Sequence, residues 1–205
     1  MGADVIKARL VKLEGRPEHV EIDLSKTALI IVDMQNVFAG RGEISGDVPP
    51  SITEELIGKT KNLAEAARTA AIKVVYLRMM KDPGRKSKSL IRTVGDTEIV
   101  DELKPLPGDI VIHKTWYSGF RGTSLDRILR ESSIEHLIFT GVVTNVCVES
   151  TLRDSYFLDY VPILISDATN NAGPPFTQQA TEWNVESSFG WVTTTEHVLR
   201  SLSGR

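Results

Sequence analysis

Residues 136–156 read HLIFTGVVTNVCVESTLRDSY, and this stretch decides how the rest of the chain is interpreted. Its first six residues are apolar and rich in branched side chains, which predicts a buried strand. The residues that follow have apolar side chains at helical spacing, so Cys147 is expected in the first turn of a helix. Because a helix start favours an anion, we expect the pKa of the Cys147 thiol to fall toward a reactive thiolate. The alternative for a lone cysteine is a small buried core residue.

Other apolar runs of strand length flank this stretch on both sides. The predicted strands are TALIIVD, KVVYLR, DIVIH, VPILIS and a short GWVTT. Predicted helices lie between them at Ile52–Ala71, Ser124–Glu131 and Phe176–Ser187, and Ser51 is the expected N-cap of the first helix. Strands that alternate with helices predict an α/β fold, here a three-layer α/β/α sandwich with a mostly parallel, doubly wound sheet of about six strands. The 205 residues form one predicted domain, 1–205, in which residues 1–26 are a peripheral arm.

Three polar residues stand at or just beyond the carboxyl ends of predicted strands, where ligands bind in parallel sheets. These residues are Asp33, Lys114 and Cys147. Asp33 is a candidate base for the thiol, because burial raises the pKa of a carboxyl group while a nearby ammonium such as Lys114 limits the rise. Backbone amides of Val143 and Cys147 are candidate donors to an oxyanion. The alternatives are an aspartate that caps a turn and a solvated lysine.

Composition argues against several classes of function. A formal charge of −3 and a pI near 5.8 do not suit a nucleic-acid-binding protein, and the apolar runs are too short to span a membrane. The charged N-terminus argues against a secretory signal, and a single cysteine suits a reducing cytoplasm. The four histidines show no ligand spacing, and no Gly-rich nucleotide motif follows a strand. We therefore expect a cytoplasmic protein that uses neither a metal nor a cofactor.

Three segments together resemble the isochorismatase-like cysteine hydrolases, a superfamily that includes nicotinamidases, carbamoylsarcosine amidohydrolase, biuret hydrolase and ureidoacrylate hydrolase. The segments are ALIIVDMQN, DIVIHKTWYSGF and TGVVTNVCVESTLRD, and the resemblance runs from about Thr27 to the C-terminus. It implies the isochorismatase-like hydrolase fold, a catalytic triad of Asp33, Lys114 and Cys147, and a cis peptide bond between Val142 and Val143. It also implies a homo-oligomer, a dimer or a tetramer.

Departures from the family pattern narrow the expected substrate. Nicotinamidases carry an Asp-x-His metal site after the second strand, whereas this chain has KDPGRKSK there. Enzymes that cleave the vinyl ether of isochorismate generally lack the cysteine. The chain is most similar to ureidoacrylate hydrolases, in KTWYSGF, LDRILR and DATNNAGPPFTQQA, but YLRMM replaces polar residues expected after the second strand. We hypothesise that Arg78, or a basic residue of the loop 81–92, pairs with a substrate carboxylate.

The resulting hypothesis is a metal-independent cysteine amidohydrolase. It would cleave a C–N bond of a small amide, carbamate or ureido compound through an acyl-enzyme on Cys147. The alternatives are a vinyl ether hydrolase and a non-catalytic redox or interaction protein that uses the thiol. Candidate substrate-binding residues are those adjacent to the triad at the same sheet edge: Gln35, Asn36, Phe38, Arg78, Trp116, Tyr117 and Thr144.

Overall fold

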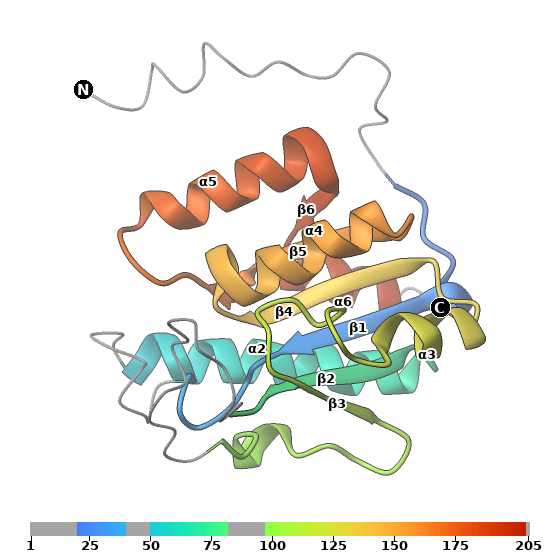
Figure 1. Cartoon of the computed structure of the whole chain (residues 1–205), viewed down its shortest axis with the longest axis horizontal. Helices are drawn as coiled ribbons and strands as arrows, with labels where there is room; N and C mark the ends of the chain where they lie inside the picture. The colour runs from blue at the N-terminus through green and yellow to red at the C-terminus, as the bar shows by residue number, and fades with distance from the viewer. Residues whose placement is uncertain (1–19, 40–49, 82–96, 204–205) are drawn as a thin grey trace.

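The computed structural model describes residues 20–39, 50–81 and 97–203. It contains one sheet of six parallel strands in the order β3-β2-β1-β4-β5-β6 (Figure 1). The strands are β1 (Thr27–Val32), β2 (Lys73–Met79), β3 (Ile110–Lys114), β4 (His136–Val142), β5 (Val161–Asn170) and β6 (Trp191–Thr193). The predicted fold class is therefore confirmed, and the sheet is parallel throughout. Most of the predicted N-terminal arm and of the basic loop 81–92 lies outside the described residues.

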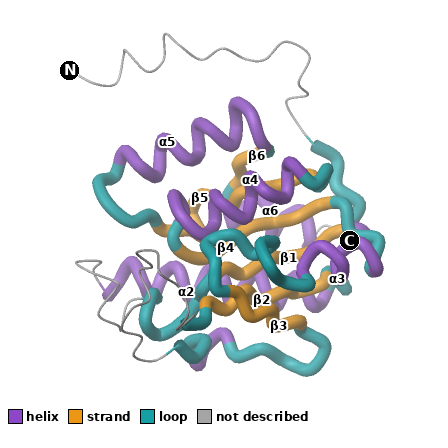
Figure 2. Tube along the Cα trace, in the orientation of Figure 1, coloured by secondary structure: helices purple, strands orange, loops and turns teal. Residues whose placement is uncertain are grey.

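Helices cover both faces of this sheet, as Figures 1 and 2 show. On one face lie α2 (Pro50–Thr69) and α6 (Thr195–Ser203), and on the other α3 (Leu125–Glu131), α4 (Glu149–Phe157) and α5 (Phe176–Asn184). Shorter helical turns are η1 (Leu24–Lys26), η2 (Asp101–Leu103), η3 (Thr144–Val148) and η4 (Val185–Phe189). The first helix begins at Pro50, so the expected cap at Ser51 is wrong. Proline suits a first helical position because its missing N–H would have no partner there.

The central strand β1 explains why both faces of the sheet are apolar. All six of its residues are buried. Leu29 and Ile31 pack in the cluster with α2, whereas Ala28, Ile30 and Val32 pack in the cluster with α3 and α4. This alternation follows from the two-residue period of a strand, and a strand buried on both faces reads as a continuous apolar run.

The order of the strands determines where a site can form. β1 pairs with β2 on one side and with β4 on the other, so the winding reverses direction between β1 and β4. In parallel sheets the loops at such a reversal separate and leave a crevice at the carboxyl ends of the strands. Asp33 follows β1 directly and η3 follows β4, so both segments border this reversal. Among the described helices, none has the length and hydropathy needed to cross a membrane.

Candidate active site

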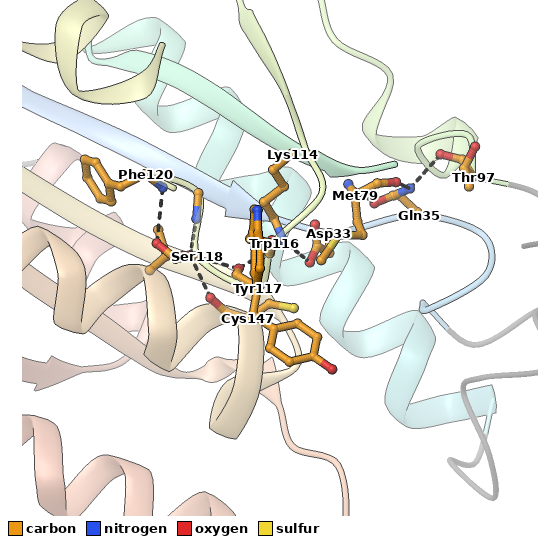
Figure 3. A network of polar contacts seen from close by, with 12 residues as sticks. Asp33, Gln35, Met79, Thr97, Lys114, Trp116, Tyr117, Ser118, Phe120 and Cys147 are labelled. Atoms are coloured by element: carbon orange, nitrogen blue, oxygen red, sulfur yellow. Dashed lines mark hydrogen bonds and ion pairs between the residues drawn. The ribbon is translucent and has the colours of Figure 1, made fainter. Parts of the chain in front are cut away.

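Asp33, Lys114 and Cys147 come together at the carboxyl edge of the sheet (Figure 3). Lys114 ends β3, Asp33 follows β1, and Cys147 lies in η3 after β4. All three are buried. The Lys114 Nζ donates a hydrogen bond of 2.7 Å to Asp33 Oδ2, and the Cys147 thiol is close enough for both groups to change its pKa. The expectation that the three residues share one sheet edge is confirmed.

The Lys114 ammonium has a full set of partners although it is buried. Besides Asp33, its Nζ donates to the carbonyl oxygens of Trp116 at 3.2 Å and Tyr117 at 3.1 Å. An ammonium has three donors, so each of them is used. Burial of a charge is tolerated when the charge is paired and fully hydrogen-bonded, and the segment after β3 supplies this by folding back over the lysine.

Asp33 is held in an unusual backbone conformation beside the lysine. Its φ is 49°, and its N–H donates to the carbonyl of Leu77 at 2.9 Å. Burial raises the pKa of the Asp33 carboxyl, while Lys114 lowers it and limits the rise, as expected. Lys114 occupies Oδ2, whereas Oδ1 is buried and accepts no conventional hydrogen bond from a described residue. Asp33 therefore keeps one oxygen available for a proton.

Cys147 differs from the sequence-based expectation in two ways. It lies in η3, a π-helical turn, and α4 begins only at Glu149. Burial raises the pKa of the Cys147 thiol well above its usual range, and the negative charge of Asp33 raises it further. Lys114 acts in the opposite direction but does not outweigh burial. The expected lowering of the thiol pKa is wrong, and the resting thiol keeps its proton until a base removes it.

The turn between β4 and η3 brings the backbone close to the thiol. The peptide bond between Val142 and Val143 is cis, as the family resemblance implies. Gly141 has a φ of 112°, and a Cβ atom on it would lie 2.1 Å from the carbonyl oxygen of Val32. Glycine is required here because the two strand ends approach closely. Of the two expected oxyanion donors, the Val143 amide belongs to this turn and the Cys147 amide lies within η3.

Thr151 supports the site and was not predicted from the sequence. Its Oγ1 donates to the carbonyl of Cys147 at 2.7 Å and accepts from the N–H of Gly119 at 3.0 Å. The hydroxyl therefore joins the start of α4 to the segment that surrounds Lys114. Its position four residues after Cys147, on the same side of a helix, is the signal that could have identified it.

Two expected binding residues are engaged elsewhere. The Gln35 side chain is fully buried, and its amide donates to the carbonyls of Met79 at 2.9 Å and Thr97 at 2.7 Å while accepting from the Met79 N–H at 2.7 Å. Figure 3 shows these bonds. Arg78 donates to the Glu98 carboxylate and to Thr97. The amide atoms of Gln35 therefore already have backbone partners, and Arg78 is not an unpaired cation.

Of the other expected binding residues, Trp116 and Tyr117 contact the triad, because their carbonyl oxygens accept hydrogen bonds from Lys114. Phe38, Trp116 and Tyr117 are half-buried, as is Asn36, whose N–H donates to the carbonyl of Glu98. Thr144 is fully buried, and its hydroxyl has no hydrogen-bond partner among the described residues. Within residues 20–39, 50–81 and 97–203, no three His, Cys, Asp or Glu side chains gather in a way that could hold a metal ion.

Comparison with known proteins identifies relatives of this architecture. Residues 27–197 match the isochorismatase domain. A protein of Caulobacter segnis named ureidoacrylate amidohydrolase RutB is 43% identical over 90% of this chain and 89% of its own. A protein of the same name from Serratia proteamaculans is 42% identical over 93% of this chain and 88% of its own.

Solved structures show the same similarity. A cysteine hydrolase of Pseudomonas syringae pv. phaseolicola superposes with a TM-score of 0.79 at 31% identity, over 91% of this chain and 96% of that one. An N-carbamoylsarcosine amidase of Thermoplasma acidophilum superposes with a TM-score of 0.72 at 27% identity, over 83% of this chain and 97% of that one.

Proposed function

Since the chain belongs to the isochorismatase family, we propose that it is a cysteine amidohydrolase that cleaves a C–N bond of a small ureido, amide or carbamate compound. The observation that carries this proposal is the buried group of Asp33, Lys114 and Cys147, in which the lysine leaves one carboxylate oxygen available beside a protonated thiol. A ureido acid is favoured as substrate, because the relatives above are named for a ureidoacrylate and an N-carbamoyl amino acid.

In the proposed mechanism, Asp33 takes the proton of the Cys147 thiol as the sulfur attacks the substrate carbonyl carbon. The amides of Val143 and Cys147 stabilise the negative oxygen that forms. The C–N bond then breaks, and Asp33 returns the proton to the departing nitrogen. Water attacks the resulting S-acyl enzyme, a thiocarbamate when the substrate is a ureide, and gives a proton to Asp33, which passes it to the sulfur when the C–S bond breaks. The carbamic acid released from a ureide then decomposes to carbon dioxide and ammonia. Lys114 keeps Asp33 ionised between these steps.

The direction of both pKa shifts agrees with this order of events. A raised pKa makes Asp33 a stronger base than an exposed carboxylate, and a raised pKa keeps Cys147 protonated until attack. Proton transfer and bond formation are then coupled, and no stable thiolate is needed. Only groups of this chain take part, so activity is expected to persist after dialysis against a chelator.

The test is hydrolysis of 3-ureidoacrylate by the purified protein, measured by release of ammonia. We expect Cys147→Ser and Asp33→Asn each to lower kcat/KM by at least about a thousandfold. Asp101→Asn, which changes an exposed carboxylate outside the site, serves as the matched control. Intact-mass measurement during turnover is expected to reveal a carbamoyl adduct that Cys147→Ser lacks. Full activity of Cys147→Ala on 3-ureidoacrylate would exclude the covalent mechanism.

We also propose that the protein acts as a homo-oligomer, as the resemblance implies, and that it works in the cytoplasm, which suits its single cysteine. Light scattering of the purified protein at micromolar concentration tests the first part. A strictly monomeric species that retains full activity would contradict it.

A further inference from the structure

A guanidinium group lies over an aromatic ring in the segment that borders the site. The Arg121 Cζ is 3.9 Å from the centroid of the Trp116 ring. The Trp116 backbone is part of the site wall, because its carbonyl oxygen accepts a hydrogen bond from the Lys114 Nζ. Figure 3 shows Trp116, Tyr117 and Cys147 grouped around the pair of Lys114 and Asp33. Arg121 thus holds its guanidinium against the side chain of a residue whose backbone contacts Lys114.

The other cations that the structure describes in this region differ from Arg121. Lys114 uses its three donors on Asp33 and two carbonyls, and Arg78 is paired with Glu98. Arg121 is exposed and forms no ion pair with a carboxylate in the described part of the chain. Lys81 is also exposed near this edge, because the neighbouring Met80 N–H donates to the carbonyl of Lys114. Among the described residues, no aromatic ring lies under the Lys81 ammonium to fix its position.

The contact with Trp116 prepares Arg121 to bind an anion. An aromatic ring attracts a guanidinium and restricts its position, so less conformational entropy is lost when a ligand binds. The N–H groups of arginine form a planar fork that matches the two oxygens of a carboxylate. An exposed, pre-positioned arginine beside a site for a small C–N compound is therefore suited to a substrate that carries its own carboxylate.

We propose that Arg121 binds the carboxylate of the substrate and thereby selects ureido acids over neutral ureides and amides. This inference rests on the proposed function, because it assumes that Cys147 attacks the carbonyl of the same molecule. The substrate lies along the Trp116 segment, with its ureido carbonyl at Cys147 and its carboxylate at Arg121. Arg121 then takes the role that we first assigned to Arg78 or to the basic loop.

The test compares two substrates that share a reacting group and differ in charge: 3-ureidoacrylate and its neutral methyl ester. We expect Arg121→Gln to raise KM for the acid about tenfold, as loss of a charged hydrogen bond predicts, and to leave KM for the ester within about twofold. kcat is expected to change little for either substrate. Arg121→Lys is expected to recover part of the loss, and added salt to raise KM of the wild type for the acid more than that of Arg121→Gln.

Arg127→Gln is the matched control. Arg127 is an exposed arginine on α3 that pairs with Glu131, and its replacement changes the net charge of the protein by the same amount as Arg121→Gln does. Equal effects of Arg121→Gln on acid and ester, or the same effect from Arg127→Gln, would overturn the inference. So would an acid-specific rise in KM from Lys81→Gln and not from Arg121→Gln. If the wild type hydrolyses neither compound, the proposed function itself fails, and the inference falls with it.

Discussion

Replacement of Lys114 by methionine isolates a carboxylate inside the protein. The Lys114 and Asp33 side chains are 0% and 2% exposed, and their charged atoms are 2.7 Å apart. Methionine has a similar length but no charge, so Asp33 stays buried without a cation. Removal of one partner from a buried ion pair typically costs about 3–5 kcal/mol. For a chain of this size each kcal/mol lowers Tm by about 2–4 °C, so we expect Tm to fall by about 6–20 °C at neutral pH.

This loss of stability should depend on pH in a defined direction. Burial already raises the pKa of Asp33 above 3.8 with Lys114 present, and without Lys114 the rise is larger. The folded protein then binds a proton more readily than the unfolded chain, so stability decreases as pH rises from about 3.8 through the folded pKa. The deficit of Lys114→Met is therefore largest at pH 7.5 and becomes smaller on acidification.

Urea unfolding followed by circular dichroism at pH 5 and pH 7.5 measures both effects. Asp33→Asn in the Lys114→Met background removes the charge and is expected to restore most of the stability at pH 7.5 and to abolish the added pH dependence. Lys104→Met breaks an exposed ion pair with Asp101 and is expected to cause no measurable loss. The reasoning would be refuted if Lys114→Met matched the wild type at pH 7.5, or if its deficit grew on acidification.

Three further changes test separate features. Gln35→Leu removes three hydrogen bonds that join the segment after β1 to Met79 and Thr97, so we expect a loss of about 3 kcal/mol in urea unfolding together with a lower kcat. Unchanged stability would show that these hydrogen bonds do not hold the segment in place. Asp33→Asn removes the base that takes the thiol proton, while burial still keeps the thiol pKa high, so iodoacetamide should alkylate Cys147 more slowly at pH 8 than in the wild type. Unchanged or faster alkylation would argue against Asp33 as the base. Gly141 and Gly108 both have positive φ values, 112° and 102°, but a Cβ atom would meet backbone atoms only at Gly141. We therefore expect Gly141→Ala to yield little folded protein and Gly108→Ala to lower the free energy of unfolding by about 1–3 kcal/mol. Equal losses in Tm for the two variants would refute the packing argument.

Much of the fold could be predicted because the signals are local. A strand buried on both faces must be apolar at every position, and TALIIV meets this requirement without reference to the rest of the chain. The edge on which Asp33, Lys114 and Cys147 meet follows from parallel strand direction alone. Local sequence also indicated the helices, although α2 begins before the residue chosen as its cap.

The errors concern properties that depend on distant residues. The thiol pKa was expected to fall because the start of a helix is visible in the sequence, whereas the burial that raises it arises only when the sheet and helices pack. Gln35 beside Asp33 looked like a substrate ligand, yet its partners Met79 and Thr97 lie 44 and 62 residues further along the chain. Arg78 likewise has no partner next to it in the sequence, but in the folded protein it donates a hydrogen bond to Thr97 and forms an ion pair with Glu98.

The order of the strands also has a consequence for dividing the chain. β4 completes the centre of the sheet by pairing with β1, although the chain builds β2 and β3 first. The exposed turn at Ser133 separates Asp33 and Lys114 on one side from Cys147 on the other. A chain cut there gives one fragment with the acid and the ammonium and a second with the sulfur, and neither fragment has the complete triad. Hydrolysis would then report reassociation of the two pieces, which makes this turn the natural place to build a split-enzyme sensor.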